Sequence, residues 1–390
     1  MIQLKMLYSE DFIERYLAFC LDYMRPRLDA AFESLEGELR EKLHLYFDTA
    51  GLRLLLSSDA LVLEVACEEI FESVPILAER FNPRHFFNSF NIDTKCDHLN
   101  LRTNEGKLAI ENIKRDVLTE VDAFLTSKPS ILLGEFVDNL NQATKAGEIK
   151  SQLGKLTSIV NGTVQANDNF KAKFPHWLEC LSNTFNYDYV IARFGTEIVN
   201  LIDLNYCPYC ADESIEPLTR YRPAIDHYFP KSKFPFLALS LHNFVPSGDR
   251  CNSRFKKNNE MVGYFNPALD ELPNAALFDF EYPLGRDFTE EDIKVTLNNV
   301  SKRLHANTRL FELEDVYNKF ETRREFKNLY DRVSMLEALG REEVLNNPQK
   351  TRVFLNVDLT LSQKKVRYQK FLVDSLNFLA DCNLVVNTSR

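Results

Sequence analysis

The chain has 390 residues, a formal net charge of −10 and a hydrophobic fraction of 45%. This length allows two or three domains with cores of their own, and the composition excludes a disordered chain. Only 12 residues are glycine. This disfavours an all-β sandwich or barrel, because tight hairpin turns use glycine at positive φ. The acidic balance excludes a protein with a uniformly basic surface for nucleic acid.

The first residues, MIQLKMLYSEDFIERY, are acidic and hold only short apolar runs. They do not form a secretory signal, and no apolar run reaches the roughly 20 residues of a membrane span. We therefore expect a cytoplasmic protein without a membrane segment, in which the eight cysteines do not form a disulfide framework.

Residues 1–160 are predicted to form a helical domain for docking or regulation. Ser9 can cap a helix whose first turn carries Glu10 and Asp11. Helical spacing of apolar residues recurs over 12–20, 28–56, 106–127 and 130–147. The polar stretch 157–169 is the expected linker to the next domain.

Residues 170–275 are predicted to form the domain that carries the chemistry, and residues 276–390 a C-terminal helical region. Within residues 170–275, a helical stretch over about 182–204 leads into the cysteines. In the second region, Thr289 precedes three acidic residues, which is typical of a helix N-terminus.

The segment Cys207-Pro-Tyr-Cys210 places two thiols two residues apart. Two such thiolates can bind one Zn²⁺ at about 2.3 Å each. A redox pair would need a strand followed by a helix that starts at the cysteines. Here a predicted helix precedes the pair and a loop with proline and arginine follows it, so the zinc interpretation is favoured.

Further polar residues follow in a characteristic order: Asp226-His227, then Asn243, then Cys251-Asn252, then Arg254, Lys256 and Lys257. With the cysteine pair, this order resembles the HNH endonuclease family. The run DHYFPKSKFPFLALSLHNFVPS is also similar to the HNH proteins of bacterial anti-phage systems of the Septu and retron type. In those systems, an HNH subunit often works beside an ABC-class ATPase.

The resemblance implies a β-hairpin packed on a helix around one metal ion, the ββα-metal fold. It implies that Asp226 and Asn252 bind Mg²⁺ or Mn²⁺, and that His227 takes a proton from the attacking water. Asn243 would orient the loop that holds His227 and fix the tautomer of its ring. Arg254, Lys256 and Lys257 would contact phosphates of nucleic acid.

The family pattern is interrupted at Gly248, where the first cysteine of a second pair is expected. Three thiols remain for zinc: Cys207, Cys210 and Cys251. Structural zinc is almost always four-coordinate. The fourth ligand stays open between Asp249, His242 and a residue from elsewhere, and the alternative is a set of packed thiols that bind no zinc.

Residues 207–258 hold eight basic and five acidic residues, a net charge of +3, so the rest of the chain carries −13. A small basic face on an acidic body predicts weak contact with DNA and little base recognition. A partner protein would then supply capture of the DNA.

Taken together, we expect a mainly α protein in which helical N-terminal and C-terminal regions flank a small HNH module. The leading hypothesis is a metal-dependent HNH endonuclease that hydrolyses DNA in phage defence beside an ABC-class ATPase. The alternatives are a non-catalytic HNH-like module that binds nucleic acid or protein, and a stand-alone restriction enzyme for modified DNA. DNA or RNA as substrate, nicking or double-strand cutting, and assembly into an oligomer stay open.

Overall fold

A computed structural model describes residues 1–4, 8–90, 92, 96–163, 168–285, 287–345, 347–382 and 384–386. The protein is mainly helical, as predicted, and its described strands form two small antiparallel sheets of two strands each. The first twelve helices are α1 Glu10–Phe32, α2 Gly37–Phe47, α3 Thr49–Ser57, α4 Ala60–Ser73, α5 Pro75–Phe81, α6 Pro83–Phe86, α7 Asn104–Ser127, α8 Ile131–Gln142, α9 Ala146–Val160, α10 Asp168–Lys171, α11 His176–Thr184 and α12 Tyr187–Ile202.

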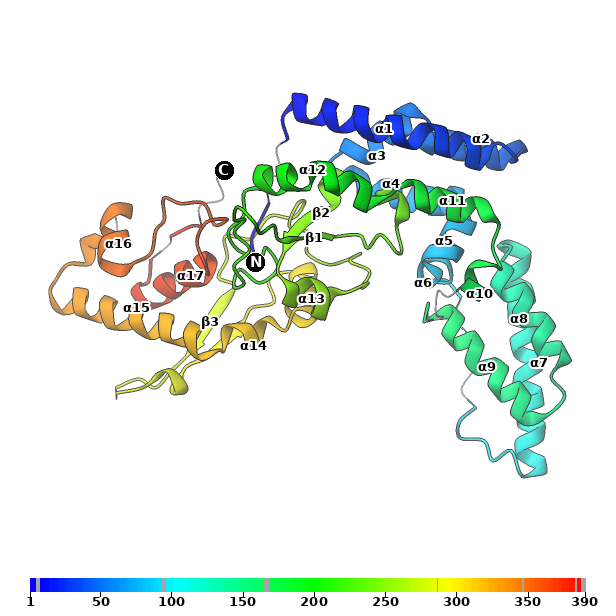
Figure 1. Cartoon of the computed structure of the whole chain (residues 1–390). Coiled ribbons are helices and arrows are strands. Elements are labelled where there is room, and N and C mark those ends of the chain that lie inside the picture. The colour runs from blue at the N-terminus through cyan, green and yellow to red at the C-terminus, as the bar shows by residue number, and fades with distance from the viewer. Residues whose placement is uncertain are drawn as a thin grey trace.

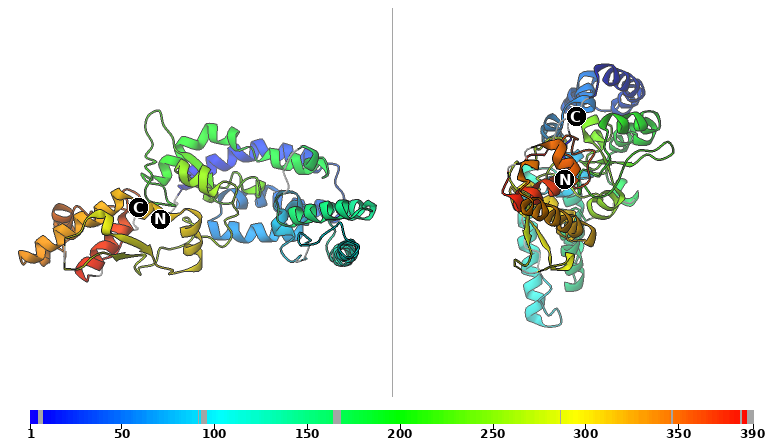
Figure 2. Two further views of the ribbon diagram at one scale, coloured as in Figure 1. Left: turned by 90° about the horizontal axis from the view of Figure 1, so that it is seen from below. Right: turned by 90° about the vertical axis from the view of Figure 1, so that its left-hand side faces the viewer.

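The molecule is elongated, and two views at right angles agree on the order of its parts (Figures 1 and 2). Helices α7, α8 and α9 form one end. The C-terminal helices, which include α15 Phe320–Ala338 and α17 Gln369–Ala380, form the other end. The first strand pair lies between these ends, close to the start of the chain.

The N-terminal helices form for the reasons that the sequence indicates. The Ser9 side chain accepts a hydrogen bond from the Phe12 backbone N–H at 3.2 Å, which caps α1. One stripe of α1 is buried, from Phe12 through Tyr16 and Cys20 to Leu28. This stripe packs against α3 and α11, so α1 covers the middle of the molecule.

The central hairpin joins β1 Ala224–His227 to β2 Phe244–Ser247. In this antiparallel pair, Asp226 lies opposite Val245 and His227 lies opposite Phe244. The connection between the strands holds two short 3₁₀ turns, η1 Pro235–Leu237 and η2 Leu241–Asn243. A short helix, η3 Arg250–Lys256, begins three residues after β2.

Helix η3 has a widened turn, in which the Lys257 N–H donates to the Asn252 carbonyl oxygen at 2.8 Å, five residues back. Such π-type turns are rare and often lie at functional sites. Lys257 itself adopts a φ of 50°, an unusual conformation for a residue with a side chain. The chain therefore ends this helix in a strained turn.

The C-terminal region differs from the prediction of helix throughout residues 276–390. A second hairpin pairs β3 Phe278–Glu281 with β4 Lys294–Leu297. In β3, Phe278 and Phe280 are buried and the acidic residues between and after them are exposed. This alternation is the period of a strand. The acidic signal after Thr289 begins only the short turn η4 Glu290–Asp292.

Helices follow this second hairpin, as predicted for the end of the chain. They are α13 Lys302–Leu310, α14 Leu313–Tyr317, α15, α16 Pro348–Leu355 and α17, with a short turn η5 Glu342–Val344 before α16. Helix α17 packs on β3 and α15.

The buried apolar residues form one continuous cluster that reaches from Met1 to Leu376. At the expected linker, α9 extends to Val160 and α10 begins at Asp168, and residues 164–167 lie outside the described residues. None of the helices in the described ranges combines the length and apolar character needed to cross a bilayer.

Candidate functional site

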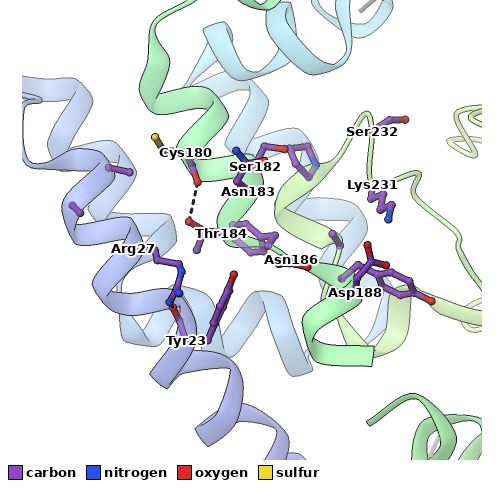
Figure 3. A pocket seen from close by; sticks show the side chains of 16 residues that line it. Tyr23, Arg27, Cys180, Ser182, Asn183, Thr184, Asn186, Asp188, Lys231 and Ser232 are labelled. Atoms are coloured by element: carbon purple, nitrogen blue, oxygen red, sulfur yellow. Dashed lines mark hydrogen bonds between the residues drawn. The ribbon is translucent and has the colours of Figure 1, made fainter. Parts of the chain in front are cut away.

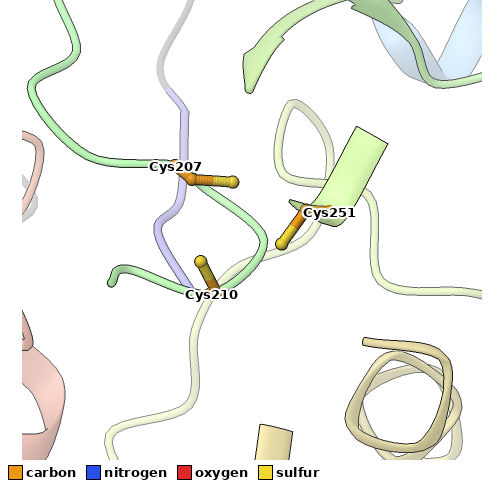
Figure 4. Close-up of side chains that lie close together, drawn as sticks. All are labelled: Cys207, Cys210 and Cys251. Atoms are coloured by element: carbon orange, nitrogen blue, oxygen red, sulfur yellow. The ribbon is translucent and has the colours of Figure 1, made fainter. Parts of the chain in front are cut away.

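The three cysteines that the sequence singled out lie together. The sulfur atoms of Cys207, Cys210 and Cys251 all lie within 4.8 Å of one another, and all three residues are buried. Figure 4 shows the first two on one loop and Cys251 facing them from η3. This group could hold a metal ion, since thiolates at this separation can share one ion.

The electrostatics of the cluster favour one thiolate. Hydrogen bonds from the Cys207 and Cys251 thiols hold the pKa of Cys210 well below its usual value. The Arg250 guanidinium adds a contact of 3.5 Å to the Cys210 sulfur. Burial raises the pKa of Cys207, and hydrogen bonds to the other two sulfurs raise that of Cys251. A cation that binds here would replace the two remaining thiol protons.

A buried carboxylate, Asp212, ties the cysteine loop to η3 and to the C-terminal region. It pairs with Arg250 at 2.7 Å, Lys319 at 2.9 Å and Arg367 at 2.6 Å, and the Tyr368 hydroxyl donates to it as well. Burial alone would raise the pKa of Asp212, but these four donors lower it well below its usual value. Asp212 thereby joins the segment directly after Cys210 to Arg250 of η3, to Lys319 before α15 and to Arg367 and Tyr368 before α17.

Asp226 is buried and bound by two side chains. The Tyr209 hydroxyl donates to its Oδ2 at 2.6 Å, and the Lys256 ammonium lies 3.1 Å from its Oδ1. Lys256 also donates to the His227 carbonyl oxygen at 2.7 Å. Burial raises the pKa of Asp226, while the charge of Lys256 acts to lower it. The carboxylate is therefore already neutralised by a cation of the protein.

Lys256 differs from the expectation that it contacts phosphates at the surface. Its side chain is 1% exposed. The widened turn of η3 directs it into the core, where it compensates the buried Asp226.

The imidazole of His227 lies in a separate aromatic environment. Its ring centroid is 4.6 Å from that of Tyr187 and 5.5 Å from that of Phe244. Successive side chains of a strand point to opposite faces, so Asp226 and His227 meet different neighbours. The His227 Nε2 lies 2.9 Å from the Ala238 carbonyl oxygen, which can only accept, so Nε2 carries the proton and Nδ1 is the basic nitrogen. Burial lowers the pKa of His227 to about 3, so the ring is neutral.

Asn243 is fully buried and clamps the connection between the strands. Its Oδ1 accepts from the Phe229 N–H at 2.7 Å, and its Nδ2 donates to the carbonyl oxygens of Phe229 and Leu237 at 3.1 and 3.0 Å. Leu237 precedes Ala238, the hydrogen-bond partner of His227. Asn243 is thus hydrogen-bonded to the segment whose Ala238 carbonyl oxygen contacts the His227 ring; the orienting role expected for it stays a prediction.

The remaining predicted residues lie on η3 or directly after it. Asn252 is half-buried, and Arg254 and Lys257 are exposed. Arg254 forms an ion pair of 3.6 Å with Asp249, which is exposed as well. Of the three basic residues expected to contact nucleic acid, the structure therefore presents Arg254 and Lys257 to solvent.

A cavity of about 850 Å³ lies beside the His227 environment, between α1, α11, α12 and the segment after β1 (Figure 3). Tyr187 and Ala238, both partners of the His227 ring, line it. Arg27 and Lys231 give it positive charge, and Asp188 is an acidic residue in its wall. The Lys231 ammonium lies 4.6 Å from the Tyr187 ring centroid and forms no ion pair with a described residue. The cavity brings an accessible cation close to His227.

Several residues that support this site were not foreseen from the sequence. The Tyr16 hydroxyl of α1 donates to the Leu239 carbonyl oxygen at 2.6 Å, although residues 1–160 showed no link to the chemistry. Tyr187 and Tyr209 contact His227 and Asp226 directly. Only the position of Tyr209 inside the cysteine pair offered a signal, since the other contacts join distant parts of the chain.

Comparisons of the chain with protein-family models, with curated proteins and with solved structures found no match.

Proposed function

We propose that this protein is a metal-dependent endonuclease of the HNH type that hydrolyses phosphodiester bonds of DNA. One observation carries the proposal. Asp226 and His227 end a β-strand, the Asn243 clamp fixes the segment beside them, and a short helix with Asn252 follows the partner strand. The residues that the family resemblance requires thus gather around one hairpin.

In this proposal, His227 acts through Nδ1, since Nε2 is held by the Ala238 carbonyl oxygen. Nδ1 takes a proton from the water that attacks phosphorus. With the pKa of His227 at about 3, the free ring is a weak base. An anionic phosphate beside it would raise that pKa, because negative charge favours the imidazolium. The Ala238 carbonyl keeps the ring oriented throughout.

A bound Mg²⁺ or Mn²⁺ would neutralise charge on the phosphate and on the leaving oxygen. Asp226 and Asn252 offer oxygen ligands of the type that these ions prefer. These two side chains thus offer the right type of ligand atom, but each oxygen of Asp226 already has a protein partner, Lys256 or Tyr209. In the proposal, the ion therefore competes with the Lys256 ammonium for the carboxylate.

We further propose that the ion held by Cys207, Cys210 and Cys251 is Zn²⁺. Its role would be to hold the loop of residues 207–210 against η3, which carries Asn252 and Lys256. Buried thiolates with a two-residue spacing are typical zinc ligands. The ion pair of 2.7 Å between Asp212 and Arg250 supports this role, because it joins the residues directly after this loop to η3.

Action in phage defence beside an ABC-class ATPase belongs to the same proposal and comes from the sequence resemblance alone. Arg254 and Lys257, the exposed basic residues after Asn252, give a small area for phosphate contact. A partner that captures DNA would compensate for it. Co-purification of the chain with an ATPase from its native operon is the corresponding test.

The direct test is incubation of the purified chain with supercoiled plasmid, single-stranded DNA and RNA in Mg²⁺ or Mn²⁺. We expect cleavage of DNA that EDTA abolishes and that the His227→Ala variant lacks. Preference for modified plasmid without a partner would instead favour the restriction enzyme for modified DNA.

A second candidate is a non-catalytic module that binds nucleic acid or protein. The contacts of Asp226 favour it, because Oδ1 is already paired with Lys256 and Oδ2 already accepts from Tyr209, so a metal would have to compete with both. This candidate predicts that His227→Ala binds DNA or its partner as well as the wild type does, and that neither protein cleaves.

A further inference from the structure

The space beside Gly248, where the side chain of the missing fourth cysteine would begin, is filled by a carboxylate. Gly248 is buried between β2 and η3, and its backbone N–H interacts with the Cys207 sulfur. A β-carbon placed on residue 248 would overlap the carboxylate of Glu213, with the carboxyl carbon and Oε2 nearest. The carboxylate of Glu213 therefore fills the space where a cysteine side chain at position 248 would begin.

The two oxygens of this carboxylate have different surroundings. Oε1 accepts a hydrogen bond from the Asp249 N–H at 2.9 Å. Oε2 is buried and has no hydrogen-bond partner among the described residues. A buried polar atom without a partner is costly, and an ion is one of its ordinary explanations.

The backbone of Glu213 is fixed beside the cysteine loop. Its carbonyl oxygen accepts from the Cys207 N–H at 2.9 Å, and its own N–H interacts with the Cys210 sulfur. Glu213 is thus tied to both cysteines of the first pair, and its side chain reaches across to Gly248 and Asp249 of the segment that carries Cys251.

We propose that Glu213 becomes the fourth ligand when zinc binds. Among the described residues, the three sulfurs form the group of ligand atoms that lie within 4.8 Å of one another and Glu213 lies outside it, so its side chain must turn Oε2 toward the ion to complete a shell of three thiolates and one carboxylate oxygen. Zinc accepts carboxylate oxygen at about 2.0–2.2 Å, and structural zinc is almost always four-coordinate. This assignment explains why residue 248 is glycine, because any side chain there would displace the Glu213 carboxylate. The inference rests on the zinc part of the proposed function and is independent of DNA cleavage.

The absorption spectrum of bound Co²⁺ reports which ligands hold the metal. The full-length chain, stripped of metal, is titrated with Co²⁺, and the thiolate-to-cobalt charge-transfer band and the d–d bands are recorded. Zn²⁺ affinity follows from competition with the bound Co²⁺. In Glu213→Gln, the amide oxygen can still accept from Asp249, so the loop keeps its support while the anionic ligand is lost. We expect altered d–d bands and a zinc affinity at least about tenfold lower.

Two further variants complete the design. Glu216→Gln changes an exposed glutamate three residues further along and should leave spectrum and affinity unchanged. The double variant Glu213→Ser, Gly248→Cys should bind Co²⁺ through four thiolates, with d–d bands at lower energy and a stronger charge-transfer band. A Glu213→Gln spectrum and affinity equal to those of the wild type overturn the assignment of Glu213 alone. Failure of the wild type to bind Co²⁺ or Zn²⁺ overturns the zinc site itself.

Discussion

The buried ion pair between Lys256 and Asp226 gives the sharpest prediction of stability. Lys256→Met keeps the length of the side chain but removes the ammonium. Asp226, only 5% exposed, then retains the Tyr209 hydroxyl but loses its cation, and the His227 carbonyl loses its donor. Removing one partner of a buried pair costs about 3–5 kcal/mol. We expect the free energy of unfolding to fall by this amount.

Urea unfolding followed by the fluorescence of Trp177, the one tryptophan of the chain, measures the change, since Trp177 is buried in α11. Lys257→Met is the matched control, because Lys257 is the next residue and is exposed. Its effect should stay within about 0.5 kcal/mol. Adding Asp226→Asn to Lys256→Met should recover part of the loss, because the uncompensated charge is removed. Equal unfolding free energies for Lys256→Met and Lys257→Met would mean that the Lys256–Asp226 pair does not stabilise the fold.

Three more predictions concern the surroundings of the site. Asn243→Ala leaves the N–H and the carbonyl oxygen of Phe229 without the partners that Asn243 provides, and the Leu237 carbonyl oxygen keeps only the Ser240 N–H as a donor. The substitution should lower the free energy of unfolding by about 3 kcal/mol or more in the same urea assay; a loss below about 1 kcal/mol contradicts the clamp. With free zinc at 1,000 times Kd, the free energy of unfolding of the wild type should be about 4 kcal/mol higher than after chelation of the zinc. The chelator should not change the free energy of unfolding of Cys251→Ser. The pKa of Asp212 is lower in the folded chain than in the unfolded chain, so ionised Asp212 stabilises the fold fully above the unfolded pKa of about 3.9. This stabilisation is lost as the pH falls through the folded pKa. In metal-free protein, the difference in Tm between wild type and Asp212→Asn should therefore be constant near neutral pH and shrink below about pH 4; a difference that grows on acidification contradicts this account.

The sequence predicted well those features that depend on neighbours along the chain. The Ser9 cap, the N-terminal helices and the grouping of Cys207, Cys210 and Cys251 follow from local spacing. The β3–β4 hairpin had a local signal, the alternation of Phe278 and Phe280 with acidic residues, but the acidic run after Thr289 favoured a helix there.

The missed features depend on contacts between distant residues. The sequence places Lys256 among basic residues that are expected on the surface of a helix. The widened turn of η3 instead directs its side chain to Asp226, 30 residues earlier. In the sequence, Glu213 is one acidic residue in a loop with no distinguishing pattern. The fold brings its carboxylate next to Gly248. Tyr16 and Tyr187 contact the site because α1 and α12 pack beside the hairpin connection. Spacing along the sequence carries no signal for such pairings.

The proposed role of His227 in phosphodiester hydrolysis can be measured directly. The most direct measurement is the initial rate of DNA cleavage in Mg²⁺ or Mn²⁺ for the wild type, His227→Ala and His305→Ala, where His305 is an exposed histidine of α13. Loss of a general base costs about 10²–10⁴ in rate. We expect a loss of at least 100-fold for His227→Ala and wild-type cleavage for His305→Ala. Equal rates for the two variants would contradict it.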